Sequence, residues 1–176
     1  MQKQIHGASS ARTLDLTKAA IIAALYVAMS LLLAPLTFGP IGIRLSEGLN
    51  FLGLYNKRYI YAITVGVFIV NYFSYGIWDM IVGSISTFIF LWIGRWLGEQ
   101  VVKHINFKID PMIIKYIVLT IVFSLSMFTI TFLVVFLGYD GPIWPLYLNM
   151  AGTEALAMIV GGFIIYPISK RINFYD

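Results

Sequence analysis

Cysteine is absent from the 176-residue sequence, and charged residues make up only 11% of it. Without cysteine the chain has no disulfide framework, no thiolate metal site and no cysteine nucleophile. Because ordinary soluble domains carry roughly 25% charged residues, this composition excludes a soluble globular enzyme, a disordered chain and a coiled coil. The formal charge of +4 indicates a surplus of basic residues on one side of a membrane, and no nucleic-acid partner is predicted.

The sequence motifs of nucleotide and metal chemistry are missing as well. There is no Gly-x-x-x-x-Gly-Lys-Ser/Thr phosphate loop, no His-Glu-x-x-His zinc motif and no Gly-x-Ser-x-Gly nucleophile elbow. The two histidines, His6 and His104, are peripheral in the predicted organisation. The sequence therefore predicts no catalytic residues, no metal site and no cofactor, and any ATP would be used by a partner.

Long apolar runs dominate the chain, and hydrophobic residues make up 60% of it. A bilayer core about 30 Å thick takes about 20 apolar residues per helix, and these runs lack the alternation of barrel strands. We therefore predict an all-α membrane protein with one integral membrane domain over residues 1–176, a six-transmembrane-helix bundle preceded by a cytoplasmic tail at residues 1–13. The predicted helices are 16–34, 41–55, 59–75, 78–102, 113–137 and 146–168.

The second predicted helix, residues 41–55, is short for a membrane span. Fifteen helical residues cover roughly 22 Å, so the segment either crosses with help from its neighbours or is re-entrant. If it crosses, eleven of the twelve basic residues lie on the cytoplasmic side and only Arg44 lies outside. If it is re-entrant, the split becomes nine to three. The positive-inside rule favours six spans with both termini cytoplasmic.

Polar side chains from four predicted helices reach the outer half of the bundle. Ionisable groups are costly in a membrane, so they face the bundle interior or a cavity and mark a functional site. Glu154 is the clearest case, since it lies about eight residues into an otherwise apolar helix. The sequence therefore predicts a polar pocket open to the outside. The predicted ligand-binding residues are Glu47, Asn50, Asn71, Trp78, Asp79, Thr87, Asn149 and Glu154.

Structural roles compete with binding for several of these residues. Asp79 can serve as the N-cap of the fourth predicted helix. Arg44 and Glu47 are three residues apart and can form an ion pair without touching a ligand. Trp144 is typical of the aromatic belt at a membrane surface. A lone carboxylate such as Glu154 has no comparable structural explanation.

The first predicted helix carries small residues at four-residue spacing. Such pairs let helix backbones approach closely in lipid, either within this chain or against another subunit. Their position near the cytoplasmic end favours docking of a partner there. The residues predicted to dock are Ala19, Ala20, Ala23, Ala24 and Ala28.

Three stretches resemble one family of membrane proteins. They are the segment Phe38–Leu49, the segment Trp78–Thr87 preceded by Asn71, and Glu154 in the last helix. Together they resemble the substrate-binding (S) components of energy-coupling-factor (ECF) transporters, and more closely the queuosine-precursor transporter (QueT) family. The resemblance covers nearly the whole chain, from about residue 14 to residue 172.

The resemblance implies a function and a set of partners. The chain would capture a 7-deazaguanine precursor of queuosine, such as 7-aminomethyl-7-deazaguanine, from outside a prokaryotic plasma membrane. The loop Pro35–Arg44 would act as a lid, with Arg44 gating or positioning it. Glu47 and Glu154 would bind the ligand's N–H donors and its ammonium group. The alanine face would dock on a membrane-embedded coupling subunit that carries two cytoplasmic ATPases.

Two other functions remain open at this stage. One is an S component for another vitamin-like small molecule. The other is a proton- or cation-coupled secondary carrier that uses Glu154 and Asp79 as proton sites. Six helices without an inverted repeat are few for such a carrier.

Overall fold

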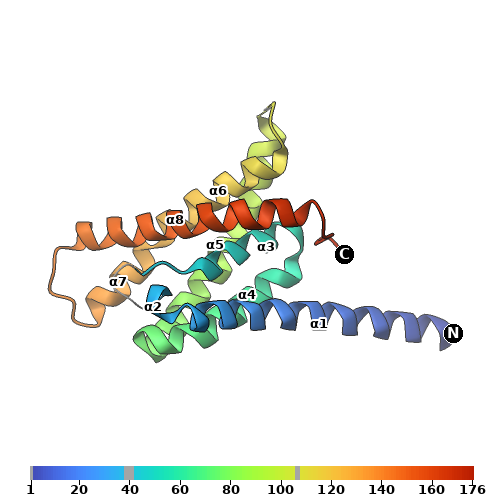
Figure 1. The fold of residues 1–176 in the computed structure, drawn as a ribbon, viewed down its shortest axis with the longest axis horizontal. Coiled ribbons are helices and arrows are strands. Elements are labelled where there is room, and N and C mark those ends of the chain that lie inside the picture. The colour runs from blue at the N-terminus through green and yellow to red at the C-terminus, as the bar shows by residue number, and fades with distance from the viewer. Residues whose placement is uncertain (1, 38–41, 106–107) are drawn as a thin grey trace.

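All regular secondary structure in the described part of the chain is helical (Figure 1). The structure is a computed structural model that describes the backbone of residues 2–37, 42–105 and 108–176, and the side chains of residues 13–37, 42–73, 76–105 and 108–176. These residues contain no strand, which confirms the all-α prediction. Their helices are α1 (Gln2–Leu32), α2 (Ala34–Thr37), the 3-10 helix η1 (Leu45–Phe51), α3 (Leu52–Tyr55), α4 (Lys57–Tyr75), α5 (Ile77–His104), α6 (Pro111–Ser126), α7 (Phe128–Phe136) and α8 (Ile143–Ser169).

Four helical stretches of the described chain are long and apolar enough to cross a bilayer. They are Thr13–Leu32 of α1, α5, Pro111–Phe136 of α6 and α7, and α8. The chain is therefore a multi-pass membrane protein by length and composition. Neither α4 nor the segment η1–α3 is among the four, so the prediction of six spans is not confirmed by this criterion.

Residues 2–13, predicted as a cytoplasmic tail, are helical and continuous with α1, and their cytoplasmic location stays a prediction. No proline occurs before Pro35, so nothing in this part of the sequence stops a helix. At its other end α1 stops at Leu32, two residues before the predicted end. Pro35 then lies in the first turn of α2, where its missing N–H removes no helical hydrogen bond.

The second predicted helix, residues 41–55, starts later than predicted and is mostly not an α-helix. Gly42 has φ +67° and Arg44 is extended, so helical structure begins only at Leu45. The segment then continues as η1 and α3, together roughly 20 Å long. Every residue from Ser46 to Tyr55 is buried. This irregular backbone is therefore shielded by protein, which is the condition for it at membrane depth.

The fifth predicted helix, residues 113–137, is divided at Met127 into α6 and α7. Side-chain hydroxyls compete with the backbone there, since Ser126 donates to the Phe123 carbonyl and Thr129 to the Ser126 carbonyl. At its start, Asp110 caps α6 through the Met112 amide, ahead of Pro111. Ser126 and Met127 at this break line a cavity described below.

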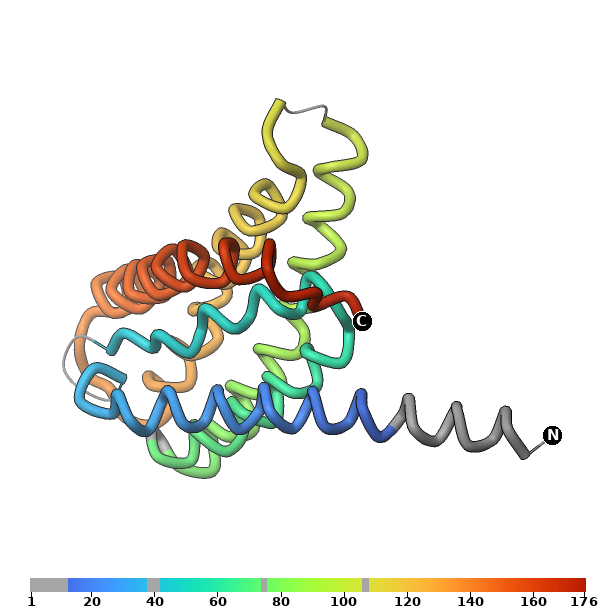
Figure 2. Tube along the Cα trace, turned by 45° about the vertical axis from the view of Figure 1, so that its right-hand side comes forward, coloured from blue at the N-terminus to red at the C-terminus, as the bar shows by residue number. Residues whose placement is uncertain are grey.

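The segment η1–α3 lies between α1 and α8, as the cyan chain in both Figure 1 and Figure 2 shows. Its contact with α8 is backbone to backbone at Gly48 and Gly161. Nearer the other end, the rings of Phe51 and Tyr116 are stacked with centroids 4.0 Å apart. Small residues and stacked rings thus hold this central element without a hydrophobic driving force from water.

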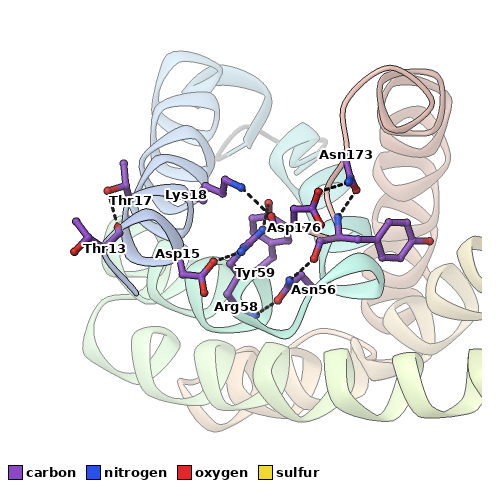
Figure 3. A network of polar contacts seen from close by, with 10 residues as sticks. Thr13, Asp15, Thr17, Lys18, Asn56, Arg58, Tyr59, Asn173 and Asp176 are labelled. Atoms are coloured by element: carbon purple, nitrogen blue, oxygen red, sulfur yellow. Dashed lines mark hydrogen bonds and ion pairs between the residues drawn. The ribbon is translucent and has the colours of Figure 1, made fainter. Parts of the chain in front are cut away.

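The C-terminal residues Asn173 and Asp176 lie beside residues 13–18 of α1 (Figure 3). Lys18 donates to the Asp176 carbonyl over 2.9 Å, and Asn56 donates to the Tyr175 carbonyl over 2.9 Å. Arg58 pairs with Asp15 in the same network. The C-terminal segment and the start of α4 therefore meet the same part of α1, which agrees with placing both ends of the chain on one side.

Candidate ligand-binding cavity

A cavity of about 540 Å³ lies at the end of the bundle opposite the network of Figure 3. Its size falls within the range of small-molecule sites, about 300–1,000 Å³. The surrounding residues come from α2, the chain before η1, η1, α4, α5, the α6–α7 break and α8. They are Thr37, Gly42, Arg44, Glu47, Val67, Asn71, Phe73, Asp79, Gly83, Ser86, Thr87, Phe123, Ser126, Met127, Ile130, Leu146, Asn149, Met150, Thr153 and Glu154.

The structure brings most of the predicted ligand-binding residues to this cavity. Asn50 and Trp78 are the exceptions. Asn50 is fully buried and contacts Glu47 without lining the cavity itself. Trp78 is 50% exposed and packs edge-on against Phe136, away from the cavity. The predicted residues that do line it are Glu47, Asn71, Asp79, Thr87, Asn149 and Glu154.

Glu154 places a carboxyl group at the cavity wall from the fourth turn of α8. The residue is 8% exposed, and its Oε1 has no hydrogen-bond partner among the described residues. Buried carboxyl oxygens are normally hydrogen-bonded, because leaving one unpaired costs free energy. An oxygen in this condition at the edge of a cavity is suited to accept a hydrogen bond from a ligand.

Glu47 differs from Glu154, because both of its oxygens are held by buried donors. Tyr26 donates to Oε1 over 2.5 Å, and Asn50 donates to Oε2 over 2.6 Å. Glu47 is only 5% exposed, yet it lines the cavity. The result is a carboxylate with a fixed orientation. Since a carboxylate oxygen accepts two hydrogen bonds, each oxygen still has acceptor capacity.

Arg44 connects the chain before η1 to α4 and α5. Its Nη1 donates to Asn71 Oδ1 over 2.7 Å, and its Nη2 lies 3.8 Å from Asp79 Oδ2. Asn71 also donates to the Asp79 carbonyl. Asp79 is therefore part of an ion pair, and the N-cap position of α5 belongs to Gly76. The structure thus gives Arg44 a different partner from the predicted Glu47.

Gly83 makes this arrangement possible. A Cβ at Gly83 would lie 2.0 Å from Asn71 Nδ2, which is far too close for two non-bonded atoms. The missing side chain leaves the space in which the Asn71 amide reaches Arg44 and α5. With Glu47, Asp79 and Glu154, the cavity wall presents three carboxyl groups against the one guanidinium of Arg44. This balance among the lining residues favours a ligand that carries N–H donors or a positive charge.

Comparison with known proteins decides the family. A model of the QueT transporter family matches residues 16–170. The chain belongs to the QueT transporter family. It is 35% identical over 164 residues to "Queuosine precursor transporter QueT" of Lactococcus lactis subsp. cremoris (strain MG1363), a match that covers 92% of this chain and 96% of that protein. No solved structure matches the chain.

Several residues of this QueT-family cavity were not predicted from the sequence. Thr37 lines it with a buried hydroxyl that has no partner among the described residues. Ser126 and Met127 line it because the fifth predicted helix breaks there. Thr153 also lines it, and its position directly before Glu154 in the sequence was the available signal. Tyr26 does not line the cavity but donates to Glu47, and it had no signal beyond being an aromatic residue inside an alanine-rich helix.

The predicted lid, Pro35–Arg44, lies partly outside the described chain, since residues 38–41 are not described. Its two flanks do reach the cavity of this QueT-family protein, through Thr37 on one side and Gly42 and Arg44 on the other. The lid role of the whole segment stays a prediction.

The predicted docking alanines of α1 divide into two groups. Ala20, Ala24 and Ala28 are exposed and lie one turn apart, so they form one continuous face. Ala19 and Ala23 are half-buried against the rest of the QueT-family bundle. The exposed group is therefore the part of the pattern available to a partner, and the other two contribute to packing within the chain.

Metal binding has no support in the described part of the chain. Among the described residues, no three His, Asp or Glu side chains are placed to hold a metal ion together. The carboxyl groups of the cavity are engaged with Tyr26, Asn50 and Arg44, or stand apart as Glu154 does.

Proposed function

We propose that the cavity binds a 7-deazaguanine precursor of queuosine, such as 7-aminomethyl-7-deazaguanine, and that the chain is the substrate-binding component of an ECF-type importer in a prokaryotic plasma membrane. The observation that carries the proposal is the unpaired, buried Oε1 of Glu154 at a cavity that also presents Glu47. The name of the Lactococcus lactis relative, a queuosine precursor transporter, supports the choice of ligand.

The chemistry of such a ligand matches the polar groups of the cavity. A guanine-like edge offers adjacent N–H donors, which one carboxylate accepts in bidentate fashion. An aminomethyl group is a cation and is stabilised by a second carboxylate. We assign these two partners to Glu154 and Glu47 in an order that binding data must decide. The ring carbonyl requires a donor, and Asn149 or Thr87 supplies one.

The flat ring of the ligand needs an apolar or aromatic surface. Trp78 does not provide it, because Trp78 lies outside the cavity. Phe123 of α6 lines the cavity but is only 2% exposed, so packing fixes its ring and little of the ring surface is open to a ligand. Offset or edge-on contact with such a ring is favourable for a planar heterocycle.

Calorimetric titration of the purified protein in detergent tests the choice of ligand. The panel is 7-aminomethyl-7-deazaguanine, its neutral 7-cyano analogue, guanine and pyridoxine. The proposal predicts tight binding of the aminomethyl compound and weaker binding of guanine and pyridoxine. If none of the deazapurines binds to a folded protein, the ligand is another vitamin-like molecule. Uptake by the chain alone in liposomes, without an ATPase, would instead support a proton- or cation-coupled carrier.

The partners follow from the face of α1. The exposed Ala20, Ala24 and Ala28 allow close approach of a helix from a membrane-embedded coupling subunit, and two cytoplasmic ATPases on that subunit would drive release inside. We expect Ala24→Trp to abolish uptake and to leave ligand binding intact. Ile159→Trp, at a 49% exposed position of α8, is the matched control. Normal uptake by Ala24→Trp would overturn docking through this face.

A further inference from the structure

The Glu47 carboxylate is positioned by a helix that does not line the cavity. Tyr26 belongs to α1, and its hydroxyl donates to Glu47 Oε1 over 2.5 Å. Tyr26 itself is fully buried, and neither it nor any other residue of α1 lines the cavity among the described residues. One hydrogen bond therefore runs from α1 to a carboxylate that faces the ligand site.

A second hydrogen bond between α1 and η1 lies one turn away. Ser30 and Ser46 share a hydrogen bond of 2.6 Å, and both are 1% exposed. Ser30 is four residues after Tyr26 and also donates to the Tyr26 carbonyl. The two contacts fix the register between α1 and η1, but only the contact from Tyr26 reaches a residue of the cavity.

The ring of Tyr26 is fully buried and packs against α4 at Gly66. A Cβ at Gly66 of α4 would lie 3.0 Å from Tyr26 Cβ and 3.1 Å from its ring atoms. The ring thus fills the space over Gly66 and holds its hydroxyl at a fixed point. Asn50 holds the other oxygen of Glu47 from within η1. Two rigid donors behind the carboxylate leave its remaining acceptor capacity directed to the cavity.

We propose that Tyr26 is a positioning residue, which fixes the Glu47 carboxylate for the ligand and makes ligand affinity depend on α1. This inference rests on the proposed function of the cavity. Binding to a carboxylate that is already oriented costs less conformational entropy than binding to a mobile one. Without the phenol hydroxyl, Glu47 retains the donor Asn50 alone, and its Oε1 becomes free to turn toward other donors in the cavity.

Titration of the Tyr26→Phe variant with 7-aminomethyl-7-deazaguanine tests this role. We expect Kd to rise by up to about tenfold, in line with the cost of ordering one mobile side chain when the ligand binds. Two controls remove a comparable buried hydroxyl. Tyr116→Phe removes the hydroxyl that bonds to Tyr55 outside the cavity, and Ser30→Ala removes the other link between α1 and η1. Both should change Kd less than about twofold.

A thermodynamic cycle separates positioning from a general loss of stability. Glu47→Asp keeps the charge but shortens the side chain, so the carboxylate no longer reaches Tyr26. In that background Tyr26→Phe should change Kd less than about twofold. An equal effect in both backgrounds, or an unchanged Kd in Tyr26→Phe alone, would overturn the inference while the proposed function stands. A wild-type chain that does not bind the compound would overturn the proposed function and this inference with it.

Discussion

Gly48 of η1 and Gly161 of α8 meet backbone to backbone, so that a Cβ at Gly48 would lie 2.5 Å from the Cα of Gly161. A Cβ at Gly161 would lie 2.1 Å from the Cα of Gly48. This contact brings Glu47, the neighbour of Gly48, to the same cavity as Glu154 on α8. The geometry of the two carboxyl groups therefore depends on the absence of two side chains.

Gly161→Ala should destabilise the protein by about 1–3 kcal/mol, because the added methyl meets backbone that has no rotamer to change. Gly152→Ala is the matched control, since it lies in the same helix and a Cβ there meets nothing within 4 Å. Thermal unfolding in a non-ionic detergent measures both. A midpoint for Gly161→Ala equal to that of Gly152→Ala would show that the contact is not as close as described.

Arg44→Gln should destabilise the protein by about 1–3 kcal/mol, because it leaves the Asp79 carboxylate, only 2% exposed, without its guanidinium partner. The variant Arg44→Gln/Asp79→Asn should recover part of this loss, since the unpaired charge is then gone. Glu99→Gln is the control, because Glu99 is 48% exposed in its pair with Arg95 and such pairs contribute little. A double variant less stable than Arg44→Gln would contradict the ion-pair interpretation.

The stability of the end of the bundle that carries Asp110 should depend on pH. The hydrogen bond from Lys170, then those from the Met112 amide and Tyr166, lower the pKa of Asp110 from 3.8 to about 2. Since the folded pKa lies below the unfolded one, the contribution is present above about pH 4 and is lost as pH falls toward 2. Asp110 is 31% exposed, so screening by salt keeps the effect small.

Thermal unfolding between pH 6 and pH 2.5 measures this effect. The midpoint of the wild type should fall more steeply than that of Asp110→Asn, which has no carboxylate to protonate at this position. Parallel curves for the two proteins would show that Asp110 contributes nothing to the loss of stability at low pH.

The proposed orientation predicts which loops react with reagents outside the cell. Since the chain has no cysteine, single variants Asp140→Cys and Arg171→Cys need no altered background, and both positions are exposed. Asp140→Cys should react with a membrane-impermeant maleimide in intact cells, and Arg171→Cys only after permeabilisation. Labelling of Arg171→Cys in intact cells would reverse the orientation of the bundle.

The sequence was sufficient for the helical class and for Glu154, and the reasons are physical. A lone carboxylate in an apolar helix is costly to bury in lipid. It therefore faces the bundle interior or a cavity, which explains its position here. Asp79 and Thr87 both line the cavity, because residues eight apart share one helix face. Trp78 precedes Asp79 by one residue and therefore points about 100° away, which explains why the same helix does not bring it to the cavity.

Contacts between distant segments were beyond prediction from one sequence. Nothing local in the sequence marks Gly48 and Gly161 as partners, although their backbones meet in the structure. The hydrogen bond from Tyr26 to Glu47 likewise joins two elements whose packing no periodicity specifies. The 3-10 geometry of η1 also depends on its burial between other helices, which local propensity does not encode.

Titration of Glu154→Gln with 7-aminomethyl-7-deazaguanine tests the proposed site most directly. The substitution keeps the size of the side chain and removes the carboxylate that accepts the ligand's donors. We predict a Kd at least about tenfold above that of the wild type, with the affinity of the exposed control Glu99→Gln unchanged. Equal affinities for Glu154→Gln, Glu99→Gln and the wild type would contradict the assignment of Glu154 to the ligand site.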